Sequence, residues 1–197
     1  MAKVVKTAKA LALGFLLLAL FCALSGKAYT AFLKSVYPLK FEEYVASQAQ
    51  NYGVEEALIY AVIKAESGFD VNAKSRAGAQ GLMQITPDTF SWLQTHAGTH
   101  PMNQDYLKNP GVNIKYGTYF ISILLEKYGS EEVALCAYNA GMGSVDRWLK
   151  DKNLSRDQRT LTNIPYPETK KYVARVLRHK ARYKNLYKDK TKEGLRK

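Results

Sequence analysis

One acidic residue stands in a segment that otherwise has the pattern of a buried helix face. The apolar residues of segment 55–67 recur at helical spacing, and Glu66 follows Val62 by four positions and Ile63 by three. It therefore projects from the core side of the expected helix. A carboxyl group that loses solvation keeps its proton to a higher pH, as a general acid near neutral pH requires. A glutamate paired with a buried partner, or one at the rim of the core, would show the same pattern.

The residues after Glu66 favour a position beside a cleft. Ser67 and Gly68 follow it directly, and no helical period is present from there to Ile85. Glycines at 78 and 81 and a short apolar run predict tight turns and a small hairpin. A helix that stops at such a loop can leave its last side chain facing a cleft.

The rest of the domain is predicted to be helical. Thr86–Pro87 and Asn109–Pro110 each combine an N-cap residue with a proline in the first turn, and Pro167 opens the last helix. Ser144 is expected to cap a short helix. The segments expected to be helical are 41–52, 55–67, 87–95, 110–128, 130–138, 144–150 and the one that begins at 167. The fold class is therefore mainly α, with a small turn or hairpin insert.

The N-terminal residues predict export. Residues 1–9 form a basic region with three lysines and no acid, and residues 10–26 are uncharged and mostly apolar. This order is typical of a signal anchor or a signal peptide, and a helix of this length spans about 25 Å, the lower limit for a bilayer core. The preceding lysines place the domain outside the cytoplasm. We expect membrane anchoring by this helix, or secretion after cleavage following Ala28, and a connector over residues 27–40.

Positive charge is concentrated near the C-terminus. The chain carries +12, and the twelve basic and two acidic residues of segment 170–197 account for +10. Such a segment can bind anionic wall polymers, lipids or nucleic acid, or it can be a solvated helix face. Because an exported domain does not meet nucleic acid, we expect no nucleic-acid partner.

Few residues are suited to a metal or cofactor site. The chain has three histidines, and its two cysteines, Cys22 and Cys136, lack the spacing of metal ligands. Cys136 is expected to be a small buried hydrophobic residue. We therefore expect no metal and no cofactor.

Four motifs occur together in the chain. They are ESGFDVNAKSRAGAQGLMQITPDT, NPGVNIKYGTYFISILLEKYG, ALCAYNAG and IPYPETKKYVARVL. Through them the chain resembles the soluble lytic transglycosylase family of the lysozyme superfamily, from about Phe41 to His179. The resemblance implies a lysozyme-like α+β domain, which we place at residues 41–187, and the concentration of charge predicts a basic tail at 188–197. The resemblance also implies that the substrate is the glycan strand of peptidoglycan.

The resemblance assigns roles to six residues. Glu66 corresponds to the single catalytic acid and base of the family, and the residues implied in substrate binding are Ser75, Gln84, Tyr138, Asn139 and Glu168. Tyr138 would approach the carboxylate, and Asn139 would support its turn. A structural role remains open for each of these five residues. Ser75 could be a loop hydroxyl, Gln84 an amide that satisfies backbone groups, and Tyr138 a core residue. Asn139 could support a turn, and Glu168 could be an acid favoured in a first helical turn.

A single carboxyl group is sufficient in the mechanism that the resemblance implies. Most glycosidases use two carboxylates, and no second acid of this chain lies on an obviously apolar face. In lytic transglycosylases the N-acetyl group of the substrate assists cleavage of the β-1,4 bond between N-acetylmuramic acid and N-acetylglucosamine, and a 1,6-anhydro ring forms. A muramidase that hydrolyses the same bond with water, and a wall-binding protein without activity, are the alternatives.

Overall fold

The computed structural model describes residues 25–188, and the chain divides into two units between Pro38 and Leu39. In the first unit residues 25–36 are helical, within the predicted connector, and Pro38 follows the end of this helix. None of the helices in the described part is long and apolar enough to cross a bilayer. The predicted hydrophobic helix over residues 10–26 lies outside the described residues except for Ser25 and Gly26.

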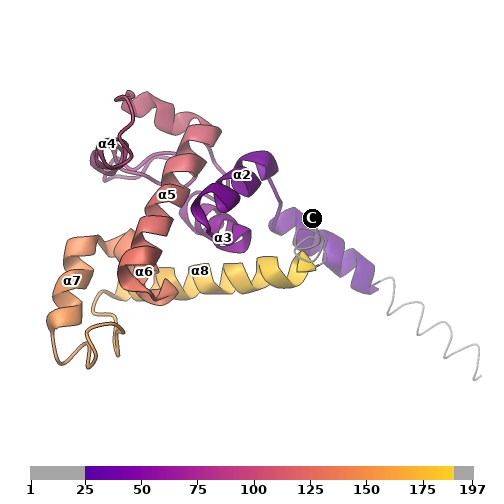
Figure 1. Cartoon of the computed structure of the whole chain (residues 1–197). Helices are drawn as coiled ribbons and strands as arrows, with labels where there is room; N and C mark the ends of the chain where they lie inside the picture. The colour runs from indigo at the N-terminus through magenta and orange to yellow at the C-terminus, as the bar shows by residue number, and fades with distance from the viewer. Residues whose placement is uncertain (1–24, 189–197) are drawn as a thin grey trace, which may run out of the picture. The chain divides into compact units, whose positions relative to one another are not determined.

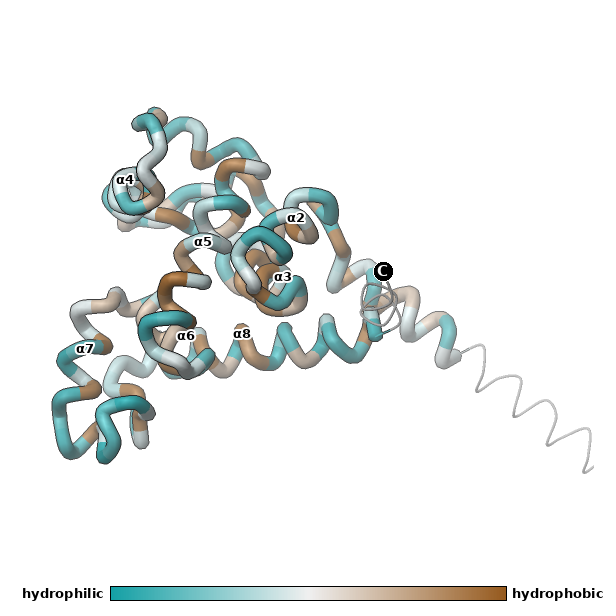
Figure 2. The backbone as a smooth tube through the Cα atoms, viewed as in Figure 1, coloured by the Kyte–Doolittle hydropathy of each residue, from teal (hydrophilic) through white to brown (hydrophobic). Residues whose placement is uncertain are grey.

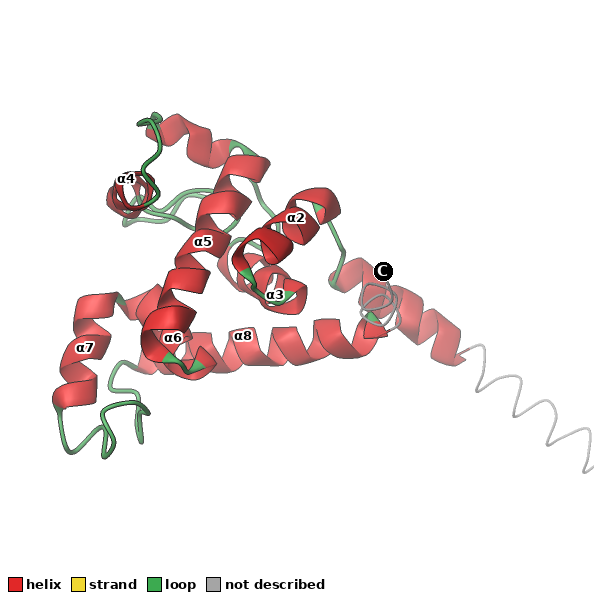
Figure 3. Ribbon diagram, in the orientation of Figure 1, coloured by secondary structure: helices red, strands yellow, loops and turns green. Residues whose placement is uncertain are grey.

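The second unit is built from helices (Figure 1). They are α2 (Glu42–Tyr52), α3 (Glu56–Glu66), α4 (Pro87–His96), the 3-10 helix η1 (Gln104–Lys108), α5 (Pro110–Tyr128), α6 (Glu131–Ala140), α7 (Met142–Lys150) and α8 (Pro167–Leu186). Loops join them, and no strand occurs within residues 25–188 (Figure 3). The prediction of a mainly helical domain is confirmed, whereas η1 was not expected.

Side-chain caps explain where α4, η1, α5 and α6 begin. The Thr86 hydroxyl accepts a hydrogen bond from the Thr89 N–H at 3.2 Å, and the Asn109 side chain accepts one from Val112 at 3.1 Å. Proline follows both caps, as the sequence predicted. Helix α7 departs from the prediction.

Helix α7 begins at Met142 rather than after a Ser144 cap. Gly141, with φ +83°, both ends α6 and precedes the first residue of α7. The Ser144 hydroxyl lies inside the helix, where it accepts a hydrogen bond from Arg147 at 3.2 Å.

Helix α3 occupies the interior of the unit. It packs against α2 and α8, while the long helix α5 contacts α2, α4 and α6 (Figure 1). Six consecutive residues of α3, from Leu58 to Ile63, are buried. Hydrophilic and hydrophobic residues alternate along α8, which is in keeping with one buried face and one exposed face (Figure 2). Cys136 is buried in α6, as expected, and its thiol is free.

The insert between α3 and α4 consists of tight turns, as predicted, whereas the alternative of a small hairpin is limited to isolated bridges. Gln80 forms isolated antiparallel bridges with Lys74 and with Ile85, and neither bridge extends into a ladder. The bridges do not extend into a ladder because the chain turns between Lys74 and Gln80 and turns again between Gln80 and Ile85. Gly81 and Gln84 both have positive φ angles, +76° and +47°, so the second turn closes between Gln80 and Ile85.

Asn113 of α5 holds this insert in place. Its amide nitrogen donates to the carbonyls of Gln80 (2.9 Å) and Leu107 (2.8 Å), and its amide oxygen accepts the Met83 N–H (2.8 Å). Because Asn113 is fully buried, every lost bond would leave a buried polar group unpaired. Gly81 approaches the same amide so closely that a Cβ atom there would overlap Asn113 Nδ2 and the Leu107 carbonyl.

We predict that Gly81→Ala destabilises the protein by roughly 3 kcal/mol, because it combines a left-handed backbone with a steric overlap. Gly98→Ala is the matched control. Gly98 also has a positive φ angle, +62°, but a Cβ there would meet nothing within 4 Å. Gly98→Ala should therefore lower the free energy of unfolding by about 1–2 kcal/mol. Chemical denaturation measures both values, and equal losses would contradict the account of the insert.

Candidate active site

Glu66 is the last residue of α3, and it stands where the helix meets the insert. Ser67, which follows it, ties the two together. The Ser67 hydroxyl donates to the Leu82 carbonyl at 2.8 Å and accepts the Phe69 N–H at 3.1 Å. The end of α3 and the turn at residues 81–83 of the insert are therefore fixed relative to one another.

The Glu66 side chain is half-buried, and the surrounding protein changes the acidity of its carboxyl group. Burial raises its pKa from 4.5 to about 7, although the Tyr172 hydroxyl and the more distant Arg175 guanidinium both act to lower it. The effect of burial on the pKa is the largest one, because no cation among the described residues forms an ion pair with this carboxyl group. Near neutral pH, Glu66 is therefore balanced between its neutral and its charged form.

Tyr172 of α8 is the hydroxyl group directed at Glu66. Its side chain is buried, and it acts as a weak hydrogen-bond donor to the carboxyl. The pair falls short of full hydrogen-bond geometry, and within residues 25–188 the hydroxyl has no other partner. Contacts of this kind commonly tighten when a ligand binds. Arg175 lies over the Tyr172 ring at 5.7 Å and adds a positive charge nearby.

Tyr138 lies within electrostatic reach of Glu66, but its proton goes elsewhere. Its hydroxyl donates to the Met83 carbonyl at 2.7 Å. Burial and, secondarily, the Glu66 carboxyl raise the pKa of Tyr138 well above its usual value, so the hydroxyl remains a donor. Tyr138 therefore fixes the insert beside Glu66 instead of binding the carboxyl directly.

Gln84 and Ser75 both bond to the backbone of the insert. The Gln84 amide nitrogen donates to the carbonyls of Gly81 (2.9 Å) and Ala73 (3.1 Å). These bonds offset the strain of its left-handed backbone. The Ser75 hydroxyl accepts the Ala79 N–H at 3.0 Å. Both side chains are partly exposed, so the Gln84 carbonyl oxygen and the Ser75 hydroxyl can still meet a ligand.

The other two predicted residues lie around the start of α8. The Asn139 amide oxygen accepts a hydrogen bond from the buried Thr169 hydroxyl at 2.8 Å, which joins α6 to α8. Glu168 is exposed in the first turn of α8. The structure therefore groups Glu66 with Tyr138 and the insert, whereas it shows no contact between Glu168 and that group.

Sequence reasoning missed two residues that shape the site, Tyr172 and Asn113. Tyr172 precedes Val176 by four positions, so helical spacing could have placed it on the buried face of α8. Spacing does not reveal which of several tyrosines faces Glu66. Asn113 lies within the quoted NPGVN stretch, and nothing local indicates that its amide reaches Gln80 and Met83, about thirty residues earlier in the chain.

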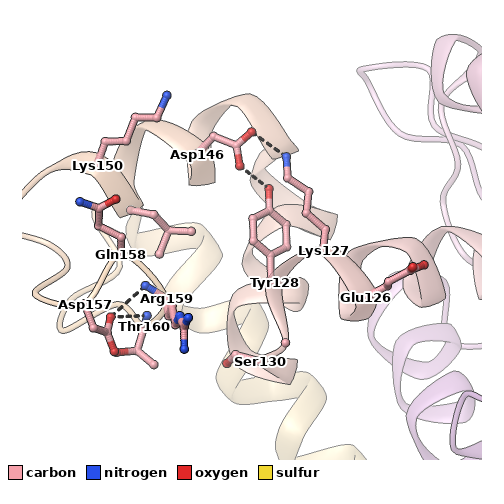
Figure 4. Close-up of a pocket in the computed structure, with 12 residues that line it drawn as sticks. Glu126, Lys127, Tyr128, Ser130, Asp146, Lys150, Asp157, Gln158, Arg159 and Thr160 are labelled. Carbon is pink, nitrogen blue, oxygen red and sulfur yellow. Dashed lines mark hydrogen bonds and ion pairs between the residues drawn. The ribbon is translucent and has the colours of Figure 1, made fainter.

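A further hollow of the domain lies away from Glu66. It has a volume of about 760 Å³ and is bordered by the end of α5, by α7 and by the loop at 157–160 (Figure 4). Asp146 accepts hydrogen bonds there from Lys127 (2.7 Å) and Tyr128 (2.9 Å). None of the predicted site residues borders it, and its Asp146 carboxylate is already held by Lys127 and Tyr128, so we do not place the reaction there.

The group around Glu66 is suited to proton transfer. One carboxyl group changes charge near neutral pH, and two neutral tyrosines stand beside it. Across residues 25–188, no cluster of His, Cys, Asp and Glu side chains could hold a metal ion. The arrangement can give a proton to a leaving group and can take one back.

Comparison with known proteins assigns the family. The family described as "Transglycosylase SLT domain" matches residues 43–160, more than half of the chain. The chain belongs to this family, and the resemblance found from the sequence is confirmed.

Individual relatives agree with this assignment. The soluble lytic murein transglycosylase of Salmonella typhimurium is 31% identical over 160 residues, which are 78% of this chain and 24% of the relative. Membrane-bound lytic murein transglycosylase C of Glaesserella parasuis is 31% identical over 165 residues, 72% of this chain and 45% of the relative. This chain thus spans a quarter to a half of the length of these curated relatives.

A solved structure shows the same fold. An inactive glutamate-to-glutamine mutant of the lytic transglycosylase Slt from Pseudomonas aeruginosa superimposes with a TM-score of 0.68 at 31% identity. The match covers 78% of this chain and 25% of that chain.

We predict that Glu66→Gln stabilises the protein at neutral and higher pH. A carboxyl group with a folded-state pKa of about 7 and an ordinary value of 4.5 binds its proton more tightly in the folded state. Stability is therefore lost as the pH rises from 4.5 to 7, and glutamine does not suffer this loss. The gain should reach roughly 3 kcal/mol near pH 8 and vanish near pH 4.

Urea denaturation at the two pH values measures this difference. Glu132→Gln, an exposed acid in the first turn of α6, is the control and should show no comparable dependence on pH. A gain for Glu66→Gln that is the same at both pH values would contradict the burial of the carboxyl.

Proposed function

We propose that this domain is a peptidoglycan lytic transglycosylase with Glu66 as its acid and base. The bond cleaved is the β-1,4 bond between N-acetylmuramic acid and N-acetylglucosamine. The observation that carries this proposal is the place of Glu66 at the junction of α3 and the insert, where burial raises its pKa to about 7. Membership of the family, and the activity that the names of its relatives state, support it.

The proposed reaction uses the Glu66 carboxyl group twice, first as an acid and then as a base. The neutral Glu66 carboxyl protonates the glycosidic oxygen, and the bond from that oxygen to C1 of the muramyl sugar breaks with help from the substrate's own N-acetyl group. Glu66, now a carboxylate, takes the proton of the muramyl C6 hydroxyl, and that oxygen bonds to C1. A 1,6-anhydro ring forms, the first proton leaves with the departing sugar, the C6 proton restores the neutral Glu66, and no water is consumed.

The surroundings of Glu66 support this cycle. A group that first gives and then accepts a proton works best with a pKa near the working pH. In our proposal Tyr172 donates to the carboxylate form, and Tyr138 holds the insert against it. Gln84, Ser75, Asn139 and Glu168 contact the glycan.

A muramidase would contain the same site, so the products must decide between the two. Purified peptidoglycan is digested, and the fragments are weighed by mass spectrometry. We predict muramyl ends that are one water lighter than hydrolysed ends. Glu66→Gln should lower the rate by roughly 10²–10⁴-fold, because the proton donor is lost.

Glu132→Gln is again the matched control, with a rate close to that of the wild type. Hydrolysed ends would replace our proposal with the muramidase. A Glu66→Gln variant that solubilised walls at the wild-type rate would exclude Glu66 from the reaction.

We further propose that the domain, residues 41–187, acts outside the cytoplasm and is held at the cell surface in two ways. The apolar segment 10–26 would anchor it in the membrane. The exposed face of α8 would bind anionic groups of the wall or membrane, because Lys171, Arg178 and Arg182 form no ion pair with any described residue. Lys180 and Lys184 differ, since both are paired with Glu55.

Cell fractionation tests both means of attachment. We predict that deletion of residues 1–26 releases the protein from membranes at high salt, and that Arg178→Glu with Arg182→Glu weakens retention at low salt only. Lys152→Glu with Arg156→Glu changes the net charge equally at exposed positions outside α8, and it should have little effect. Equal losses of retention from the two double substitutions would show that retention depends on net charge alone.

A further inference from the structure

Trp92 of α4 is exposed in a way that packing does not explain. Its neighbours Phe90 and Leu93 are buried at 1% and 0% exposure, whereas Trp92 retains 37%. Indole is a large apolar surface, and leaving it in water forgoes the free energy of its burial. A single exposed aromatic residue is common, so the position of Trp92 relative to the site decides whether it has a function.

A chain of ring contacts joins Trp92 to the site. The Trp92 and Phe120 ring centroids lie 6.1 Å apart and meet edge to face, at 75°. The Phe120 ring lies 5.2 Å from the Tyr138 ring. Tyr138 in turn is within electrostatic reach of Glu66. Three helices, α4, α5 and α6, supply these rings, and the indole is the exposed end of the series.

Polar groups also lie close to the indole. The His96 ring lies 5.2 Å from Trp92, and His96 Nδ1 shares a hydrogen bond of 2.7 Å with the Tyr119 hydroxyl. Trp92 thus contacts both Phe120 and His96 before any ligand arrives. A fixed aromatic face with hydrogen-bonding groups at its edge matches a sugar ring, which offers C–H groups on its face and hydroxyls around its rim.

We propose that Trp92 is a stacking platform for a sugar of the glycan strand, adjacent to the sugars that meet Glu66. This inference rests on the proposed function, because it takes the ligand of the Glu66 site to be a glycan. Phe120 holds the indole in line with Tyr138, and the strand extends from the Glu66 site across α4. Trp92 then contributes to the affinity for long strands and not to the chemical step.

The chain offers a direct optical test, because its two tryptophans are Trp92 and Trp148. Trp148→Phe leaves Trp92 as the sole indole, and Glu66→Gln in the same protein prevents turnover. We expect a saturable change in fluorescence when this protein is titrated with purified glycan strands of graded length. The change should appear only with strands long enough to reach beyond the sugars at Glu66.

Kinetics on the wild-type background provide the second test. Trp92→Ala should raise KM for long strands about tenfold, leave kcat within about twofold and leave short fragments unaffected. Trp92→Tyr, which retains an aromatic face, should recover most of this loss. Tyr106→Ala is the matched control, since Tyr106 is 53% exposed and has no ring contact with this series.

The outcomes separate the two proposals. Two results together would refute the stacking role of Trp92: an unchanged KM for Trp92→Ala, and no change of Trp92 fluorescence in the titration. This holds even if Glu66→Gln proves inactive. A wild-type protein without any activity on walls refutes the proposed function, whereas the fluorescence titration still reports whether Trp92 binds glycan. Circular dichroism confirms that every variant is folded.

Discussion

The burial of one carboxyl group without a matching cation is the constraint on which the rest of this structure depends. Glu66 would be more stable as an ordinary surface acid, or paired with a lysine, and the fold allows neither. Burial alone outweighs the help of Tyr172 and Arg175 and raises the pKa to about 7. The free energy that this costs must be offset by other interactions of the fold, among them the burial of six consecutive residues of α3.

Most of the polar bonds near Glu66 maintain this environment and do not touch the carboxyl itself. Ser67 binds the Leu82 carbonyl, Tyr138 binds the Met83 carbonyl, and Asn113 binds the Met83 N–H. Three helices thereby hold two consecutive residues of the insert. A loop rich in turns is made rigid in this way, which a site for proton transfer needs, because small displacements of a carboxyl group change its reactivity greatly.

The sequence predicted the helices well, since caps and apolar spacing are local signals. Glu66 was found by the same means, because its position on an apolar face is a matter of helical register. The insert was predicted less well: the hairpin reduces to two single bridges, because the positive φ angle of Gln84 is not encoded by residue type. Tyr172 and Asn113 were missed because their roles depend on contacts across the fold. Tyr138 was expected at the carboxyl, and its bond to Met83 was visible only in three dimensions.

The central claim concerns the acidity of one side chain, and it can be measured without substrate. Titration of the Glu66 carboxyl carbon by NMR, with isotopically labelled glutamate and Glu66→Gln used for assignment, gives its pKa directly. We expect a value of about 7 in the wild type, and a higher value in Tyr172→Phe because the hydroxyl that favours the carboxylate is removed. A wild-type value close to 4.5, unchanged in Tyr172→Phe, would contradict the account.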